Sequence, residues 1–189
     1  MGAADRHSGR PGSNRGLVPR RRPVVTDPRI RPFEDRDWPA VRAIIDHVVE
    51  SGTSYTYDSG LSDAAYRALW IGAAPGGTVV AEDMDGTILG TAKLSRNQHG
   101  PGSHIANASF MVAPEARGRG VGRQLGEHIV AWAAAAGFRA MQFNAVVSDN
   151  HSAVALWTSL GFAVIGTVPE GFRHRDGRFA DLLIMHRRL

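Results

Sequence analysis

SFMVAPEARGRGVGRQLGEHIVAW, residues 109–132, combines a short strand, a tight glycine-rich turn and a long helix. Ser109 to Val112 are mostly apolar, as a buried strand requires. Pro114 ends this strand, because proline has no N–H group and a fixed φ. Beyond the turn, apolar residues recur at the spacing of one helix face. The sequence therefore predicts a helix that begins where three glycines alternate with larger residues.

The turn and the first residues of that helix predict an anion site. The first N–H groups of a helix have no partner within the helix, and the helix dipole is positive at that end. Glycines let a ligand approach the backbone closely, which suits a pyrophosphate. A tight turn without any ligand would need the same glycines, and the sequence matches neither a nucleoside-triphosphatase loop nor a dinucleotide-binding fingerprint. The main-chain N–H groups predicted to bind the anion are those of Arg117, Gly118, Arg119, Gly120, Val121 and Gly122.

The periodic segments predict an α+β domain over residues 29–189. In chain order they are a strand, two helices, three strands, a helix, a strand, a helix and two strands, which makes a mixed sheet with helices on its faces. The two closing strands are expected at residues 162–168 and 180–186. Polar residues suited to the N-cap position precede three of the helices, at Asp37, Ser62 and Asn150.

Composition excludes several classes of protein. The chain of 189 residues is long enough for one domain of ordinary size, and it contains no cysteine, hence no disulfide and no thiolate metal ligand. No apolar run approaches the roughly 20 residues of a membrane span, and the first residues do not resemble a secretory leader. We therefore expect a soluble cytoplasmic protein with no membrane association and no bound metal.

Basic residues are concentrated at the N-terminal end. The whole chain has a net charge of +4, but residues 1–22 hold six arginines and one acid, which leaves a net charge of −1 for the rest. This segment, rich in Gly, Pro, Ser and Arg, is predicted to be disordered as part of an extension over residues 1–28. Nucleic-acid binding by this arm is disfavoured because it has no aromatic residue to stack on a base, and no amphipathic period supports a transit peptide.

A second motif, NHSAVALWTSLGF at residues 150–162, begins 28 residues after Gly122. Taken alone, its asparagine could serve only as a helix N-cap. Together, the two motifs resemble those of the GCN5-related N-acetyltransferase (GNAT) family, which has an acyl-CoA loop after a strand ending V-x-P and the signature N-x-x-A-x-x-L-Y-x-x-x-G-F. The resemblance covers about residues 29–189. The residues that match the loop pattern are Val112, Pro114, Arg117, Gly120 and Gly122.

The resemblance implies the GNAT fold, a mixed sheet of about seven strands flanked by about four helices. It also implies acetyl-CoA as the cosubstrate, without a metal. The main chain of Met111 and Val112 would pair with the pantetheine arm, and Asn150 and Ser152 would bind the cofactor. A homodimer formed through the final strands is compatible with the resemblance, although the residues themselves do not prove it.

The groups that carry acid–base chemistry in many relatives are absent here. Trp157 replaces the family's tyrosine, and indole has no proton to release near neutral pH, so we expect it to pack rather than react. The strand at residues 104–112 contains no carboxylate that could act as a base. His104 could take a proton, but it lies at the start of this strand, away from the loop. Asn107 can orient a substrate or donate to an oxyanion, but it cannot act as a base.

Asn107, Asn144 and Asn150 together resemble one branch of the family, the fungal N-acetyltransferases that detoxify L-azetidine-2-carboxylate, a proline analogue. The branch implies that Asn107 binds the acceptor and that Asn144 lies near both the acceptor and the thioester. Both are therefore candidate catalytic and substrate-binding residues, and Asn144 is a candidate cofactor contact as well. Tyr55 is predicted to contribute to substrate binding, because it lies in a polar loop that the family uses for its acceptors.

We therefore predict an acetyl-CoA-dependent N-acetyltransferase in which the amine of a small molecule attacks the thioester directly in a ternary complex. An amino acid or proline analogue is the candidate acceptor, and the turn at residues 171–178 is expected to influence the choice. Two alternatives stay open. One is an enzyme that acetylates protein or peptide amino groups. The other is a non-catalytic acyl-CoA sensor, which the missing carboxylate and Trp157 would suit.

Overall fold

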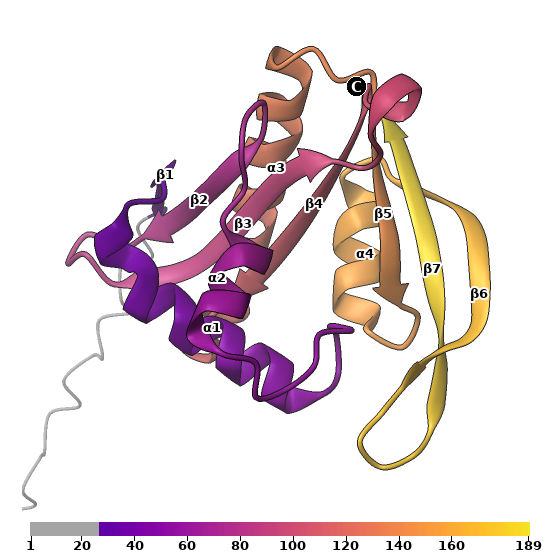
Figure 1. The fold of residues 1–189 in the computed structure, drawn as a ribbon, viewed down its shortest axis with the longest axis horizontal. Coiled ribbons are helices and arrows are strands. Elements are labelled where there is room, and N and C mark those ends of the chain that lie inside the picture. The colour runs from indigo at the N-terminus through magenta and orange to yellow at the C-terminus, as the bar shows by residue number, and fades with distance from the viewer. Residues whose placement is uncertain (1–26) are drawn as a thin grey trace, which may run out of the picture.

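One mixed sheet of seven strands forms the centre of the structure, a computed structural model that describes residues 27–189 (Figure 1). The strands are β1 (Arg29–Pro32), β2 (Gly77–Glu82), β3 (Ile88–Arg96), β4 (Ile105–Val112), β5 (Ala140–Val147), β6 (Ala163–Arg173) and β7 (Phe179–Arg188). The helices are α1 (Trp38–Ser51), α2 (Asp63–Trp70), α3 (Val121–Ala135) and α4 (His151–Ser159). This confirms the predicted α+β class. The disorder predicted for residues 1–28 falls almost wholly outside the described residues.

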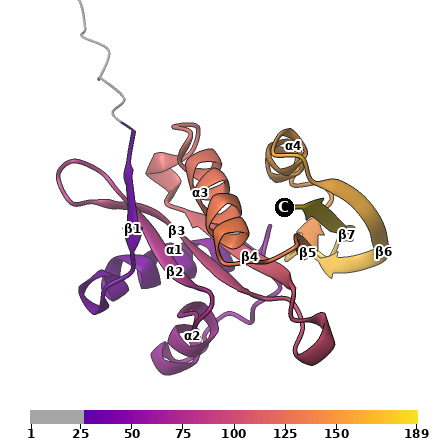
Figure 2. The ribbon, with the colours of Figure 1, turned by 90° about the horizontal axis from the view of Figure 1, so that it is seen from above.

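Each face of the sheet is covered by two helices. Figure 2 shows α1 and α2 on one face and α3 and α4 on the other. Trp70 of α2 donates its indole N–H to Thr91 Oγ1 of β3 at 3.0 Å. Thr91 lies directly opposite Met111 of β4, so the odd-numbered residues of β4 face α1 and α2. We call this side of the sheet the α1–α2 face, and Asn107 lies on it.

Two of the three predicted helix caps are confirmed. Ser62 Oγ accepts a hydrogen bond from Ala65 N–H, and Asn150 Oδ1 accepts one from Ala153 N–H, each at 3.2 Å. Asp37 takes the predicted N-cap position of α1, but its side chain makes no cap bond to the helix. Its carboxylate instead accepts two hydrogen bonds from the guanidinium of Arg31, a long-range partner that local sequence does not reveal.

The closing strands are longer than predicted. β6 continues to Arg173 through a register shift between Val168 and Phe172, which accommodates Pro169 in an edge strand. The hairpin of β6 and β7 therefore extends beyond the rest of the sheet, as Figure 1 shows. β7 stays beside the chain just past β5, since Ser148 N–H donates to Asp181 O at 2.9 Å, and His174 of the turn lies 3.0 Å from Asp149.

The sheet opens between its two parallel strands. The strand order is β1-β2-β3-β4-β5-β7-β6, and β4 pairs with β5 only at Ile105↔Ala140 and Ala106↔Met141. Within residues 27–189, the edge of β4 that faces β5 has no ladder partner from Asn107 onward. Such an edge presents free N–H and C=O groups to whatever enters the gap.

Among residues 27–189, no helix is long and apolar enough to cross a membrane.

Candidate functional site

A cleft with a volume of about 950 Å³ occupies the gap between β4 and β5. Its walls come from the free edge of β4, the glycine turn, the end of β5 and the start of α4. The α1–α2 loop and the β6–β7 turn complete it. The order of the strands therefore brings together both sequence motifs, which lie far apart in the chain. Sequence-predicted residues that line the cleft are Tyr55, Asn107, Met111, Val112, Arg117, Gly118, Gly120, Val121, Gly122, Asn144, Asn150 and Ser152.

Only part of the predicted set of turn N–H groups is free. Arg117 N–H donates to Pro114 O and Arg119 N–H to Ala116 O, each at 3.3 Å, so the prediction is wrong for these two groups. Within residues 27–189, the N–H groups of Gly118, Gly120, Val121 and Gly122 have no hydrogen-bond acceptor. They lie at the N-terminus of α3, where the helix dipole favours an anion.

The glycines of the turn are required by its backbone. Gly118 and Gly120 have φ of +75° and +82°, in the left-handed region that other residues rarely adopt. A Cβ at Gly120 would meet no other atom within 4 Å, so the turn is open to solvent on that side. The N–H groups are thus both free and accessible.

The three arginines of the turn have different roles. Arg119 turns away from the cleft and pairs with Asp83 in the β2–β3 turn at 2.8 Å, which removes it from the predicted cofactor contacts. Arg117 and Arg123 line the cleft. Arg123 was not predicted, and it donates to Ser159 Oγ of α4 at 2.8 Å. The turn therefore offers two cations as well as free N–H groups.

The main chain of β4 faces alternately toward β3 and toward the cleft. Ala113 N–H donates to Leu89 O of β3 at 2.9 Å, and by alternation Met111 faces β3 too. The main-chain contact predicted for Met111 is therefore wrong, although its atoms reach the cleft wall. Val112 faces the cleft and keeps the predicted position. Phe110, which was not predicted, faces it as well.

Tyr55 already uses the main chain of Phe110. Its hydroxyl donates to Phe110 O and accepts from Phe110 N–H, both at 2.8 Å. These bonds fix the α1–α2 loop against the free edge of β4. Burial raises the pKa of Tyr55 far above its ordinary value, and burial also raises the pKa of Tyr57, whose ring centroid lies 5.3 Å away. Both phenols stay protonated at neutral pH.

Asn107 and Asn144 both line the cleft, one from β4 and the other from β5. Asn144 lies where the register between β5 and β7 shifts, and such a bulge redirects a side chain. Its Nδ2 donates to Asn97 Oδ1 at 2.6 Å, and its Oδ1 accepts from Gln142 Nε2 at 2.8 Å. Asn97 and Gln142 were not predicted, and they hold the Asn144 amide in one orientation.

Asn150 combines its capping role with a place in the cleft wall. Its Oδ1 accepts from Ala153 N–H at 3.2 Å and from Ser152 Oγ at 3.0 Å. The amide Nδ2 is the end of the side chain that remains for a ligand. Asn150 and Ser152 therefore sit together at the N-terminus of α4, in the wall of the cleft.

Trp157 belongs to an aromatic cluster in which the helix packs on the sheet. Its ring lies 4.6 Å from Phe110 and 4.9 Å from Phe143, measured between centroids, and only 8% of the residue is exposed. This is the packing role expected for it.

Among the described residues, no group of three or more His, Asp and Glu side chains could hold a metal ion.

The β6–β7 turn supplies cleft residues that were not predicted individually. His174, Asp149 and Arg178 line the same wall of the cleft. The turn containing two of them was expected to influence the choice of substrate, but no local motif marks the histidine or the aspartate. Only the extension of β6 brings them together.

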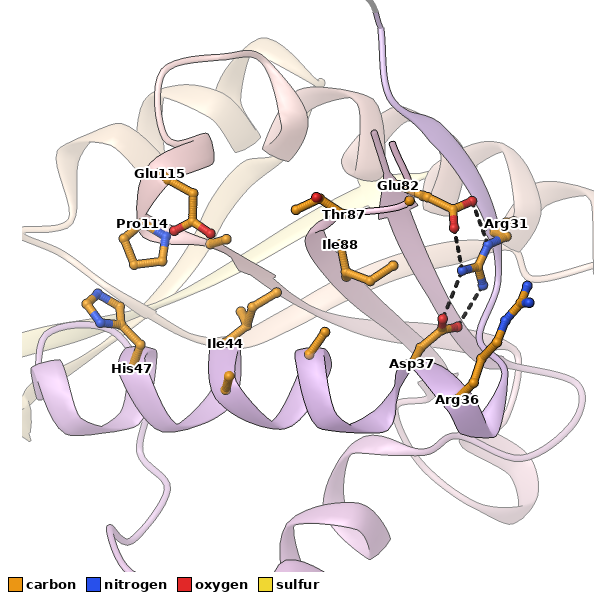
Figure 3. A pocket seen from close by; sticks show the side chains of 14 residues that line it. Arg31, Arg36, Asp37, Ile44, His47, Glu82, Thr87, Ile88, Pro114 and Glu115 are labelled. Atoms are coloured by element: carbon orange, nitrogen blue, oxygen red, sulfur yellow. Dashed lines mark hydrogen bonds and ion pairs between the residues drawn. The ribbon is translucent and has the colours of Figure 1, made fainter. Parts of the chain in front are cut away.

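A second hollow of about 760 Å³ lies between α1, the β2–β3 turn and residues 113–115, which follow β4 (Figure 3). Its floor contains the buried guanidinium of Arg31, which bonds Asp37 at 2.7 and 2.8 Å and Glu82 at 2.9 Å. The guanidinium of Arg31 is thus fully engaged within the protein. We regard this ion-pair cluster as a structural feature.

Comparison with known proteins agrees with the two motifs and the fold. The model of the acetyltransferase (GNAT) family matches residues 36–162. The chain is 30% identical to phosphinothricin N-acetyltransferase of Alcaligenes faecalis, over 85% of this chain and 82% of that protein. It is 31% identical to an L-methionine sulfoximine/L-methionine sulfone acetyltransferase of Pseudomonas paraeruginosa, over 79% and 87%. The match with N-acetyltransferase aca1 of Schizosaccharomyces pombe, at 32% identity, spans 53% of this chain and about half of that protein, 48%.

Solved structures show the same architecture. A GCN5-related N-acetyltransferase from Kribbella flavida has 51% identity and a TM-score of 0.82, over 85% of this chain and 97% of that one. A phosphinothricin acetyltransferase from Sinorhizobium meliloti, determined in complex with acetyl-CoA, has 28% identity and a TM-score of 0.79, over 87% and 89%. The chain belongs to the acetyltransferase (GNAT) family and is an N-acetyltransferase.

Proposed function

We propose that the protein transfers the acetyl group of acetyl-CoA to the amine of a small, amino-acid-like molecule by direct attack in a ternary complex. The observation that carries this proposal is the opening between β4 and β5, which ends at the free N–H groups of Gly118 and Gly120 to Gly122. The acetyl-CoA complex of the related Sinorhizobium meliloti enzyme supports the choice of cofactor.

The cofactor would lie along the cleft, with its pyrophosphate on the free N–H groups of the glycine turn. Arg117 and Arg123 would add positive charge there. The pantetheine arm would follow the free edge of β4 at Val112, and the start of α4 would offer Asn150 and Ser152. The cleft of about 950 Å³ is large enough for both the arm and a small acceptor.

Asn107 and Asn144 remain the proposed contacts of the acceptor and the reacting thioester. Both line the cleft, and Asn144 is held by Asn97 and Gln142. A fixed amide can donate to the oxyanion that forms when the amine attacks the carbonyl, without reorganising during the reaction. Tyr55, which also lines the cleft, is proposed to shape the acceptor pocket.

A small acceptor fits the way in which the α1–α2 side is closed. A Cβ on Gly52, at the end of α1, would lie 2.8 Å from Arg175 Cγ, so the β6–β7 turn packs closely on the α1–α2 loop. The α1–α2 loop and the β6–β7 turn, which both contribute to the cleft wall, are thus in contact, which leaves less room for an extended peptide than for a small amine. Two relatives are named for amino-acid-like acceptors, phosphinothricin and methionine sulfoximine, which supports the same choice.

A screen of acceptors tests the proposal. We expect release of free CoA from acetyl-CoA with one or more free amino acids, which should include methionine sulfoximine, phosphinothricin and cyclic proline analogues. N-terminal peptides of matched sequence form the control. Faster release with peptides would instead show an acetyltransferase of protein amino groups, and binding of acetyl-CoA without release with any amine would show a sensor.

Replacing Asn107 with Ala should lower kcat for the preferred amine about 10-fold or more, because an orienting or oxyanion donor is lost. The affinity for acetyl-CoA, measured by titration calorimetry, should not change. Ser95→Ala is a matched control, since Ser95 lies directly opposite Asn107 on β3. An equal loss of cofactor affinity in Asn107→Ala would remove Asn107 from the acceptor role.

A further inference from the structure

His174 is a buried histidine in the wall of the cleft. It follows β6, and its exposed fraction is 8%. Its ring packs edge-on against Phe172, with the centroids 5.0 Å apart. Its main chain is fixed by two turn bonds, from His174 N–H to Arg178 O at 2.8 Å and from Gly177 N–H to His174 O at 3.0 Å. The ring is therefore held in one place beside the open cleft.

One ring nitrogen of His174 faces a carboxylate. Nε2 lies 3.0 Å from Asp149 Oδ2, in the segment that joins β5 to α4. The two atoms are close but not aligned for a hydrogen bond, and Nε2 is the one buried side-chain nitrogen or oxygen in residues 27–189 without an aligned partner. A buried polar nitrogen without a hydrogen bond costs free energy, so such a group usually has a function or acquires a partner.

The arrangement suits a proton acceptor. A carboxylate beside Nε2 favours the tautomer that carries the proton there and leaves the lone pair on Nδ1. It also stabilises the imidazolium once Nδ1 has taken a proton. Hydrogen bonds of catalytic pairs are often poorly aligned before the substrate binds, which fits the geometry of this pair.

The charges around His174 come from two elements. Asp149 faces it from the segment between β5 and α4, and Asp176, Arg175 and Arg178 lie in its own turn. Arg178 is bound to Asp176 at 2.8 Å and lies 4.0 Å from Asp149. Asp149 is thus the carboxylate nearest to the imidazole, while most of the charge of Asp176 is balanced by Arg178.

We propose that His174, oriented by Asp149, is the base that takes a proton from the ammonium group of the acceptor. This inference rests on the proposed function. β4 has no carboxylate that could act as the base, and His174 would supply this group. The ammonium gives one proton to Nδ1, and the resulting amine forms a C–N bond with the acetyl carbonyl carbon. The C–S bond breaks, its electron pair leaves on the sulfur of CoA, and the second amine proton passes to that thiolate through solvent.

The pH profile of kcat/KM distinguishes a base from a structural histidine. In the wild-type enzyme kcat/KM should rise with pH and reach a plateau, because a base must be neutral before it can accept a proton. In His174→Gln, kcat/KM should be about 100-fold lower at pH 7. It should continue to rise with pH toward the pKa of the free amine, so that the difference from the wild type disappears at high pH. A loss of equal size at every pH would overturn the proposal.

Two further variants complete the experiment. His151→Gln replaces an exposed histidine at the start of α4 and should leave the profile unchanged. Asp149→Asn keeps His174 but removes the carboxylate that orients it, so the plateau of kcat/KM should fall. This variant also serves if thermal unfolding shows that His174→Gln does not fold. An unchanged profile in Asp149→Asn would contradict the proposed pair.

The outcomes separate this inference from the proposed function. If the wild-type protein releases no CoA with any amine, the proposed function fails. If the wild type is active and His174→Gln keeps the plateau of the wild type, only the role of His174 fails. If kcat/KM of the wild type falls as pH rises through neutrality, a charged imidazole is required instead, as for binding the carboxylate of the acceptor, and the base assignment is overturned.

Discussion

Acetyl-CoA should bind about 100-fold more weakly to Gly120→Asp than to the wild-type protein, a loss of about 2.7 kcal/mol. Gly120 is the N-cap residue of α3, and its N–H is among those proposed to hold the pyrophosphate. A carboxylate at this position would repel the pyrophosphate and compete for the same donors. Titration calorimetry with acetyl-CoA, at fixed ionic strength, measures the effect.

Gly120→Asn is the matched control. Asparagine has nearly the same shape as aspartate and tolerates the left-handed conformation, with φ of +82°, about as well. There is space for either side chain, since no atom lies within 4 Å of the Cβ position. The asparagine variant should therefore retain most of the affinity. Equal losses in the two variants would indicate a steric or backbone effect and would count against the anion site.

Arg31→Met should destabilise the protein by about 3 kcal/mol or more. The guanidinium of Arg31 is the shared partner of Asp37 and Glu82, and the side chains of Arg31 and Asp37 are 8% and 4% exposed (Figure 3). Removing it would leave the Asp37 carboxylate buried without a counter-ion, which costs far more than the loss of a surface pair. Unfolding in urea, monitored by circular dichroism, gives the free energy of unfolding.

Arg36→Met is the control for this prediction. Arg36 pairs with Glu34 at 2.8 Å, but the two side chains are 71% and 52% exposed, so its loss should cost less than about 1 kcal/mol. Similar losses for the two arginines would show that burial does not strengthen the Arg31 cluster.

The pH dependence of the free energy of unfolding offers an independent measure of the Arg31–Asp37 pair. Hydrogen bonds from Arg31 lower the pKa of Asp37 below its ordinary value. The charged carboxylate therefore contributes stability that is fully present above its unfolded pKa of about 4 and is lost as pH falls through the lower pKa of the folded state. The difference in unfolding free energy between the wild type and Asp37→Asn should be largest at pH 7 and should shrink in acid.

The fold was predictable from short-range patterns. Apolar periodicity, the caps at Ser62 and Asn150, and the glycine turn before α3 each depend on a few neighbouring residues, and the structure has all of them where expected. The two motifs could be assigned to one cleft because the resemblance supplied the order of the strands. Periodicity alone would have left that order open.

The details of the site depend on contacts between distant segments. Asp37 looks like a helix cap, but Arg31 and Glu82 make it part of a buried cluster. Arg119 pairs with Asp83, but nothing in the local sequence distinguishes it from Arg117 and Arg123. His174 meets Asp149 only because β6 runs past Val168, which local sequence did not indicate. Pairings of this kind follow from tertiary geometry and leave no periodic signal.

The parting of β4 from β5 after two residue pairs has a mechanical consequence. The sheet consists of two parts, β1 to β4 and β5 to β7, whose strands pair with each other only at one end of the β4–β5 boundary. The pantetheine arm of acetyl-CoA, bound as proposed, would lie between these two parts of the sheet like an extra strand. It would therefore hold the two parts together while the cofactor is bound. Release of CoA would leave the gap open again, and the next acetyl-CoA could enter it without any part of the chain unfolding.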